Sequence, residues 1–205
     1  MDNNIITAGT PLGEAKKALV MVHGRGASAQ DVLGIAQYLD VAGYALIAPQ
    51  APGHTWYPLS FLAPPQDNEP HYSRSLTILH NTVTHIEEQG ISKENIYFLG
   101  FSQGACLVTE YTARHAARYG GVVAFTGGLI GDRIYAENYT GNFGGTPVFI
   151  GTGNPDHHVP VQRVYDTETV LDSLGATVTV KVYDGRPHTI SQDEINLANE
   201  LVFNN

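Results

Sequence analysis

The sequence is poor in cysteine, in positive charge and in long hydrophobic runs, and each scarcity excludes a class of protein. Cys106 is the single cysteine, so the chain cannot close a disulfide of its own, and a lone thiol agrees with a reducing compartment. Lysine and arginine number 11 against 20 aspartate and glutamate residues, and the net charge of -9 argues against nucleic acid as a partner. No apolar stretch is long enough to span a membrane, and residues 18–22 are too short for a signal-peptide core. We therefore expect a cytoplasmic protein.

The remaining composition is that of an ordinary globular protein, with 42% hydrophobic and 15% charged residues. A chain of 205 residues can bury a sizeable core, and we expect a single domain over residues 1–205. Short β-rich apolar runs alternate with longer segments of helical period, which predicts an α/β fold with a mostly parallel central sheet and helices on both faces. The expected strands are residues 18–22, 45–48, 96–100, 122–125, 148–151 and 178–183, and the expected helices are residues 29–39, 73–89, 103–118, 161–174 and 192–202.

Two helix starts and one long loop are recognisable between these segments. Ser191 is followed by Glu194, and Ser28 by Asp31, at the spacing of a capping box, in which each side chain pairs with a backbone N–H of the first turn. Residues 50–72 form the longest irregular stretch and contain five prolines, at positions 52, 58, 64, 65 and 70. A loop of that length in a compact domain is more often functional than idle, so we expect it to serve the function of the protein.

The strongest motif is G-x-S-x-G at residues 100–104, which follows a buried strand and opens a helix. A serine hydroxyl attacks only when it is exposed and near a base, and a sharp strand-to-helix turn lifts Ser102 clear of the sheet. The helix start also directs N–H groups toward developing negative charge. With 22 glycines the pattern could arise by chance, but the flanking strand and helix favour a nucleophile. Cys106, one helical turn further on, is interpreted as a buried core thiol.

Sequences with this nucleophile turn place an acid and then a histidine after the serine. His188 follows the last expected strand, in a loop at the edge of the sheet where ligands bind in open α/β folds. Asp156 follows the preceding strand and is the preferred acid, with the role of orienting the imidazole. Asp184 is the competing acid, but its position four residues before His188 suits a turn residue better. His115 falls inside an expected helix and is interpreted as a surface residue.

His157 and His158 beside Asp156 raise the alternative of a metal site. Adjacent histidines in an extended loop point to different sides, and no third ligand lies at a recognisable spacing, so we expect no metal. One of the two histidines is expected to line the substrate cleft.

An oxyanion hole needs a second donor besides the backbone N–H of Gln103. The loop at residues 22–27 follows the first apolar strand, and its glycines allow the backbone to approach a ligand closely. We expect the N–H of Arg25 to be that donor. A plain strand-to-helix turn would use the same glycines, and the two interpretations are compatible.

Taken together, these motifs resemble the phospholipase/carboxylesterase family of α/β hydrolases, which includes acyl-protein thioesterases. The resemblance extends over nearly the whole chain in ordered blocks, which are HGRGA at 23–27, APQAP at 48–52, GFSQGA at 100–105, TGGL at 126–129, NPDHHVP at 154–160 and GRPHTI at 185–190. It implies a catalytic triad of Ser102, Asp156 and His188, hydrolysis of carboxylic esters and no cofactor. It also implies that the Trp56-Tyr57 segment borders the acyl pocket. The residues expected to contact substrate are Gly24, Trp56, Tyr57, Phe61, Gly127 and His158.

The segment WYPLSF at 56–61 resembles the small bacterial carboxylesterase branch more than the thioesterase branch. Residues 64–70 are polar and acidic, unlike an apolar channel for a long acyl chain. We therefore expect small or short-acyl esters as substrates. The alternative for Trp56 and Phe61 is that they pack as a lid over the core.

Other functions remain open on the sequence alone. A thioesterase or lysophospholipase would use the same triad, and a non-catalytic binding protein would use the same fold, although such proteins usually lack a triad member. A dienelactone-hydrolase-like enzyme would be expected to carry cysteine in place of Ser102. The physiological ester and the oligomeric state, including a homodimer, are not determined by any residue here.

Overall fold

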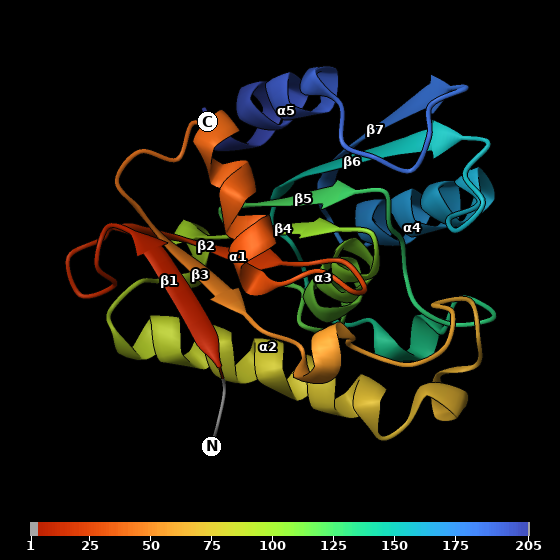
Figure 1. The fold of residues 1–205 in the computed structure, drawn as a ribbon, viewed down its shortest axis with the longest axis horizontal. Coiled ribbons are helices and arrows are strands. Elements are labelled where there is room, and N and C mark those ends of the chain that lie inside the picture. Colours follow the sequence, from red (N-terminus) through yellow and green to blue (C-terminus); the bar gives the residue numbers. More distant parts are fainter. Residues whose placement is uncertain (1–3, 205) are drawn as a thin grey trace.

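A computed structural model describes residues 4–204, which are organised around a seven-stranded sheet (Figure 1). The strand order is β1-β3-β2-β4-β5-β6-β7; β1 pairs antiparallel with β3, and all other neighbours are parallel. The strands are β1 (Ile5–Gly9), β2 (Lys17–Val22), β3 (Tyr44–Pro49), β4 (Ile96–Phe101), β5 (Gly121–Phe125), β6 (Pro147–Asn154) and β7 (Thr177–Asp184).

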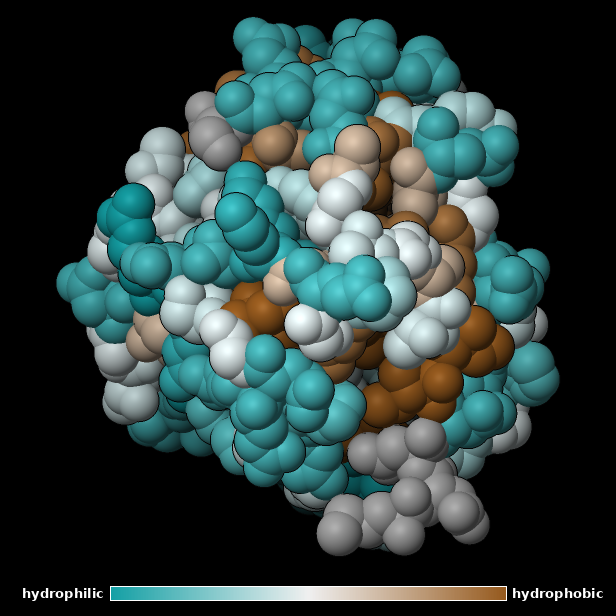
Figure 2. Space-filling view, turned by 90° about the vertical axis from the view of Figure 1, so that its left-hand side faces the viewer, coloured by the Kyte–Doolittle hydropathy of each residue, from teal (hydrophilic) through white to brown (hydrophobic). Residues whose placement is uncertain are grey.

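Helices cover both faces of the sheet and produce two hydrophobic cores. On one face pack α2 (His71–Glu88), α3 (Gln103–Arg114) and α4 (Val161–Ser173), and on the other pack α1 (Ala29–Leu33) and α5 (Gln192–Ala198). The central strands are apolar along most of their length because both of their faces are buried. Figure 2 shows the side of the molecule that lies on the left in Figure 1. On this face, hydrophilic residues border a hydrophobic area that covers less of the surface than they do.

The six expected strands are confirmed, each extended by one or more residues at one or both ends. Strand β1 was not predicted, because it is an edge strand whose last three residues are exposed and it therefore lacks a buried apolar run. The two capping boxes, at Ser28 and Ser191, are also confirmed.

Three of the expected helices differ from the structure at their ends. The segment 29–39 divides into α1 and a 3-10 helix (Gly34–Tyr38), and the C-terminal helix ends in a π-helical turn (Asn199–Phe203). Helix α3 stops at Arg114, so His115 is its exposed C-cap rather than an interior residue. The other two expected helices, α2 and α4, differ from their expected bounds by at most two residues.

The long loop after β3 contains two short 3-10 helices, Pro52–His54 and Pro65–Asn68, and lies at the carboxyl edge of the sheet. The loops that follow β2, β4, β6 and β7 end at the same edge, because parallel strands all point the same way. Within residues 4–204, no helix combines the length and the hydropathy that a membrane crossing requires.

Candidate active site

Ser102 occupies a strained turn between β4 and α3. Its backbone lies in the left-handed half of conformational space (φ 56°, ψ -119°), and its N–H donates to the carbonyl of Phe125 at 2.9 Å. The two glycines of the motif are required by close backbone approach, since a Cβ on Gly100 would overlap the Gly104 carbonyl and a Cβ on Gly104 would overlap the Val22 carbonyl. The G-x-S-x-G pattern is therefore a steric requirement of the turn that exposes the serine.

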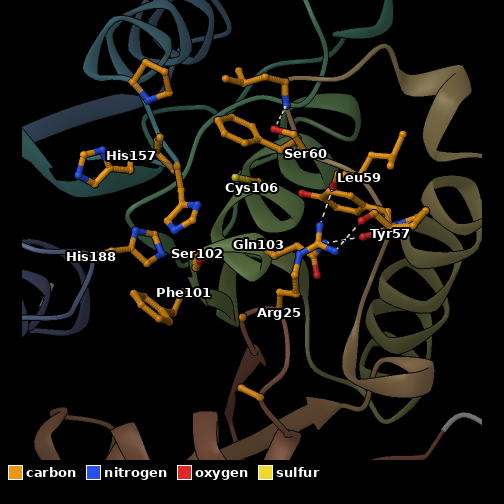
Figure 3. Close-up of a pocket in the computed structure, with 18 residues that line it drawn as sticks. Arg25, Tyr57, Leu59, Ser60, Phe101, Ser102, Gln103, Cys106, His157 and His188 are labelled. Atoms are coloured by element: carbon orange, nitrogen blue, oxygen red, sulfur yellow. Dashed lines mark hydrogen bonds between the residues drawn. The ribbon is translucent and has the colours of Figure 1, made fainter. Parts of the chain in front are cut away.

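Two hydrogen bonds connect Ser102, His188 and Asp156 in a line (Figure 3 shows the serine and the histidine facing each other). His188 Nε2 lies 2.8 Å from Ser102 Oγ, and His188 Nδ1 lies 2.7 Å from Asp156 Oδ2. Asp184, the alternative acid, is an exposed residue at the end of β7.

The Asp156 carboxylate is held in its ionised form. Burial by itself raises its pKa, but hydrogen bonds from His188 and from the backbone N–H groups of Val159 and His158 outweigh burial, and the pKa of Asp156 is lowered. Because an ionised carboxylate only accepts hydrogen bonds, Nδ1 of His188 must donate to it. Nε2 is then left as an acceptor for the serine hydroxyl.

The residues expected to form an oxyanion hole lie beside Ser102. Gln103 is the first residue of α3, where a backbone N–H has no partner within the helix. In the described part of the chain no acceptor pairs with the backbone N–H of Arg25. Two contacts with His54 hold the loop that contains Arg25. The Gly26 N–H donates to the His54 carbonyl at 2.7 Å, and the His54 ring contacts the Ala27 carbonyl at 2.8 Å.

The side chains of these two residues hold the neighbouring wall of the cavity, residues 57–59, and the Trp56 backbone just before it. Gln103 accepts from the Trp56 N–H at 3.0 Å and donates to the Tyr57 carbonyl at 2.8 Å. The Arg25 guanidinium donates to the carbonyls of Pro58 (2.7 Å) and Leu59 (2.6 Å), as the dashed lines of Figure 3 show. Hydrogen bonds thus connect the two residues beside Ser102 to the wall of the cavity.

A cavity of about 610 Å³ opens over Ser102 and His188. Four of the six residues expected to contact substrate line it, namely Gly24, Tyr57, Phe61 and His158, and so do Arg25 and Gln103. One of His157 and His158 was expected to line the cleft, and both do. The motifs did not predict the other lining residues, which are Ala27, Pro58, Leu59, Ser60, Leu62, Phe101, Cys106, Val159 and Pro160. Most of them are direct neighbours of the motifs, and that adjacency could have identified them.

The structure does not bring Trp56 or Gly127 to the cavity. Trp56 is 1% exposed, packs against the His23 ring at 5.1 Å and donates through Nε1 to the His23 carbonyl. It therefore packs over the core, the alternative considered for it, whereas Phe61 lines the cavity. Gly127 lies against α3, where a Cβ would overlap Ala105.

Cys106 and the two histidines next to Asp156 have distinct environments. Burial raises the pKa of the Cys106 thiol to about 12, so the thiol is neutral where it lines the cavity, as expected of a core cysteine. The His158 ring packs edge-on against His188 with 5.0 Å between centroids. Among residues 4–204, no group of three or more histidine, cysteine, aspartate or glutamate side chains is arranged to hold a metal ion.

Known proteins resemble this chain in sequence, in fold or in both. A phospholipase/carboxylesterase of known structure from Dyadobacter fermentans DSM 18053 is 52% identical and has a TM-score of 0.97, with 98% of this chain and 97% of that chain covered. Acyl-protein thioesterase 1 of Kluyveromyces lactis is 27% identical over an alignment 216 residues long. The alignment covers 95% of this chain and 94% of the thioesterase. Esterase PE8 shares the fold, with a TM-score of 0.78 at 22% identity over 95% of each chain.

The sequence profile described as Phospholipase/Carboxylesterase matches residues 3–202, nearly the whole chain. This match agrees with the strand order, the nucleophile turn and the similarity to the Dyadobacter protein. The chain belongs to the phospholipase/carboxylesterase family of α/β hydrolases and is a serine hydrolase.

Proposed function

We propose that this protein is a carboxylesterase that hydrolyses small or short-acyl esters through Ser102, His188 and Asp156, without a cofactor. The observation that carries the proposal is the pair of hydrogen bonds that joins these three side chains beneath a cavity of ligand size. The single thiol, Cys106, supports a reducing compartment, and we propose the cytoplasm.

In the first step, Ser102 Oγ attacks the ester carbonyl carbon while Nε2 of His188 takes the hydroxyl proton. The ionised carboxylate of Asp156 stabilises the imidazolium and keeps its Nδ1–H in place. When the tetrahedral intermediate collapses, the carbon–oxygen bond to the leaving alcohol breaks and the alcohol takes the proton from Nε2. The acyl group remains as an ester on Ser102.

In the second step, water enters the place of the alcohol and gives a proton to Nε2 of His188 as its oxygen attacks the acyl carbon. Collapse of this intermediate breaks the bond to Ser102 Oγ, which recovers its proton from the imidazolium. The products are the free acid and the starting enzyme.

The backbone N–H groups of Gln103 and Arg25 are the proposed donors to the oxyanion in both steps. The first-turn position of Gln103 and the lack of an internal acceptor for the Arg25 N–H, within the described residues, support this assignment. Removal of one such donor typically costs about 100- to 1,000-fold in rate.

The burial of several lining residues supports a short acyl group. Tyr57 and Cys106 are each about 1% exposed and Phe61 is 7% exposed, so core side chains close the inner wall of the cavity. Leu59, by contrast, is 47% exposed and lies at the mouth. Gly24 and His158 also line the cavity, and we propose that they contact substrate.

The test is hydrolysis of p-nitrophenyl esters of increasing acyl length by the wild type and by Ser102→Ala. We expect the highest kcat/KM with acetate or butyrate esters and a loss of about a millionfold in kcat in the variant. Long-chain thioesters hydrolysed far better than short oxygen esters would favour the thioesterase alternative. No turnover of any ester by the folded wild type would favour a binding protein.

A further inference from the structure

A buried ion pair lies next to the loop that carries His188. The Arg186 guanidinium donates through Nη1 to Glu194 Oε2, and the two side chains are 10% and 0% exposed. Arg186 is two residues before His188, and Glu194 is in the first turn of α5. The pair therefore connects the loop of the proposed base to a helix on the sheet.

Arg186 also contacts the two sides of the proposed active site. Its Nη1 donates to the Thr189 carbonyl at 2.8 Å, immediately after His188, and its Nη2 lies 3.4 Å from Thr126 Oγ1. Thr126 follows Phe125, whose carbonyl accepts the Ser102 N–H. One guanidinium thus lies between the backbone that carries the base and the strand end that holds the nucleophile.

Glu194 caps the start of α5 through hydrogen bonds with Ser191, and these bonds do not involve Arg186. Its carboxylate accepts from the Ser191 N–H at 2.8 Å and from the Ser191 hydroxyl at 3.0 Å, while its Oε1 is buried without a hydrogen-bond partner among the described residues. A buried ion pair often contributes no more stability than well-packed apolar residues of similar size, because desolvation of the charges is costly. Stability alone is therefore a weak reason for Arg186 to be buried here.

The surrounding sheet leaves room for the pair, and the loop has few other anchors. A Cβ on Gly151 of β6 would overlap Glu194 Oε1, so this strand position must be glycine for the carboxylate to fit. No apolar side chain in the segment 181–190 is fully buried, so apolar packing contributes little to holding the loop in place. The His188 ring packs beside Phe101 and His158, and polar contacts hold the backbone on either side of it.

From these contacts we propose that Arg186, held by Glu194, is a positioning residue that fixes the His188 loop for proton transfer to and from Ser102. The inference rests on the proposed function. Arg186 does not line the cavity, so it acts through the backbone on either side of His188 rather than on substrate. Misplacement of a reacting group by about 1 Å can cost about 100-fold in rate, so a small shift of this loop suffices.

The test compares Arg186→Met, Arg186→Lys and the double variant Arg186→Met/Glu194→Met with the wild type. We expect Arg186→Met to lower kcat about 10- to 100-fold and to leave KM within about twofold, because the contact matters for proton transfer and not for substrate binding. The double variant replaces the pair by apolar side chains but also removes the carboxylate that caps α5, so its unfolding midpoint should recover in part while kcat stays low. Arg133→Met, which breaks the exposed pair with Glu137, is the matched control and should match the wild type.

A double variant with wild-type kcat would overturn the proposal, because it would reduce the pair to a stabilising contact. Arg186→Lys keeps the buried charge but cannot reproduce the planar fork, so its kcat should lie between those of the wild type and Arg186→Met. If the methionine variants failed to fold, the lysine variant would still test the proposal. Wild-type kcat in that variant would show that the several hydrogen bonds of the guanidinium are not needed to position His188. Ser102→Ala in the same series separates the two hypotheses, since an active wild type and an inactive serine variant support the proposed function whatever Arg186 does.

Discussion

Nδ1 of His188 lies 2.7 Å from Oδ2 of Asp156, and the other carboxylate oxygen of Asp156 accepts two backbone N–H groups of its own loop. The carboxylate is thereby fixed on one side by the loop and directed at the imidazole on the other. In the proposed mechanism, this arrangement lets Asp156 fix the tautomer and the orientation of His188.

The first prediction concerns that function. Asp156→Asn keeps the size of the side chain but allows an amide N–H to face Nδ1, which favours the wrong tautomer of His188. We expect kcat to fall about 10,000-fold with little change in KM, as for triad acids in general. Asp184→Asn is the control, since Asp184 is exposed at the end of β7 and should keep wild-type kcat. Equal losses in the two variants would contradict the choice of Asp156 as the acid.

The second prediction concerns acid stability. The pKa of Asp156 is lower in the folded protein than its ordinary value, so its ionised form stabilises the fold at a pH above the unfolded-state value of about 3.9. This contribution is lost as the pH falls through the lower, folded-state pKa. Urea unfolding of the wild type and Asp156→Asn from about pH 6 to pH 3 should show that the stability advantage of the wild type shrinks toward acid. An advantage that grows toward acid would contradict the sign of the shift.

The third prediction concerns the side chain of Gln103, which braces the cavity wall. Gln103→Glu keeps an acceptor for the Trp56 N–H but places a carboxylate oxygen against the Tyr57 carbonyl. A lost hydrogen bond with an unpaired partner costs about 1–3 kcal/mol, and we expect the wall to loosen. The ratio of kcat/KM for acetate over hexanoate esters should fall about tenfold. An unchanged ratio would show that the brace does not set acyl preference.

Fold class and most of the candidate site could be predicted because their signals are local. The turn around Ser102 needs glycine at both flanks for steric reasons, and buried parallel strands need apolar residues on both faces. Strand β1 could not be predicted, since an exposed edge strand carries no such pattern. Trp56 was assigned to the acyl pocket by resemblance, yet its indole turns away to the His23 carbonyl.

Polar contacts that side chains make with other elements could not be predicted from the sequence. Arg186 and Glu194 are eight residues apart, and their pairing depends on how the last loop returns over the sheet and on the space left by Gly151. The brace from Gln103 to Trp56 spans 47 residues and has no sequence pattern of its own. Such contacts are consequences of the assembled fold, whereas motifs are properties of short segments.

The fourth prediction tests the steric reason for the nucleophile motif. Gly104→Ala places a Cβ against the backbone of Val22 and should destabilise the fold by about 3 kcal/mol or more, because no flexible side chain can move aside. Gly13→Ala is the matched control, since a Cβ there has nothing within 4 Å and the change should lie within about 1 kcal/mol of the wild type. Urea unfolding of both variants gives the comparison, and similar midpoints would contradict the close packing at the turn.

The most direct test of the account is covalent labelling of the protein with a fluorophosphonate, followed by mass mapping of the adduct. If His188 and Asp156 activate Ser102 as their hydrogen bonds indicate, the wild type should acquire one adduct, located on Ser102. His188→Ala should label far more slowly, and Ser102→Ala should not label. An adduct on any other residue, or no adduct on the folded wild type, would contradict the account.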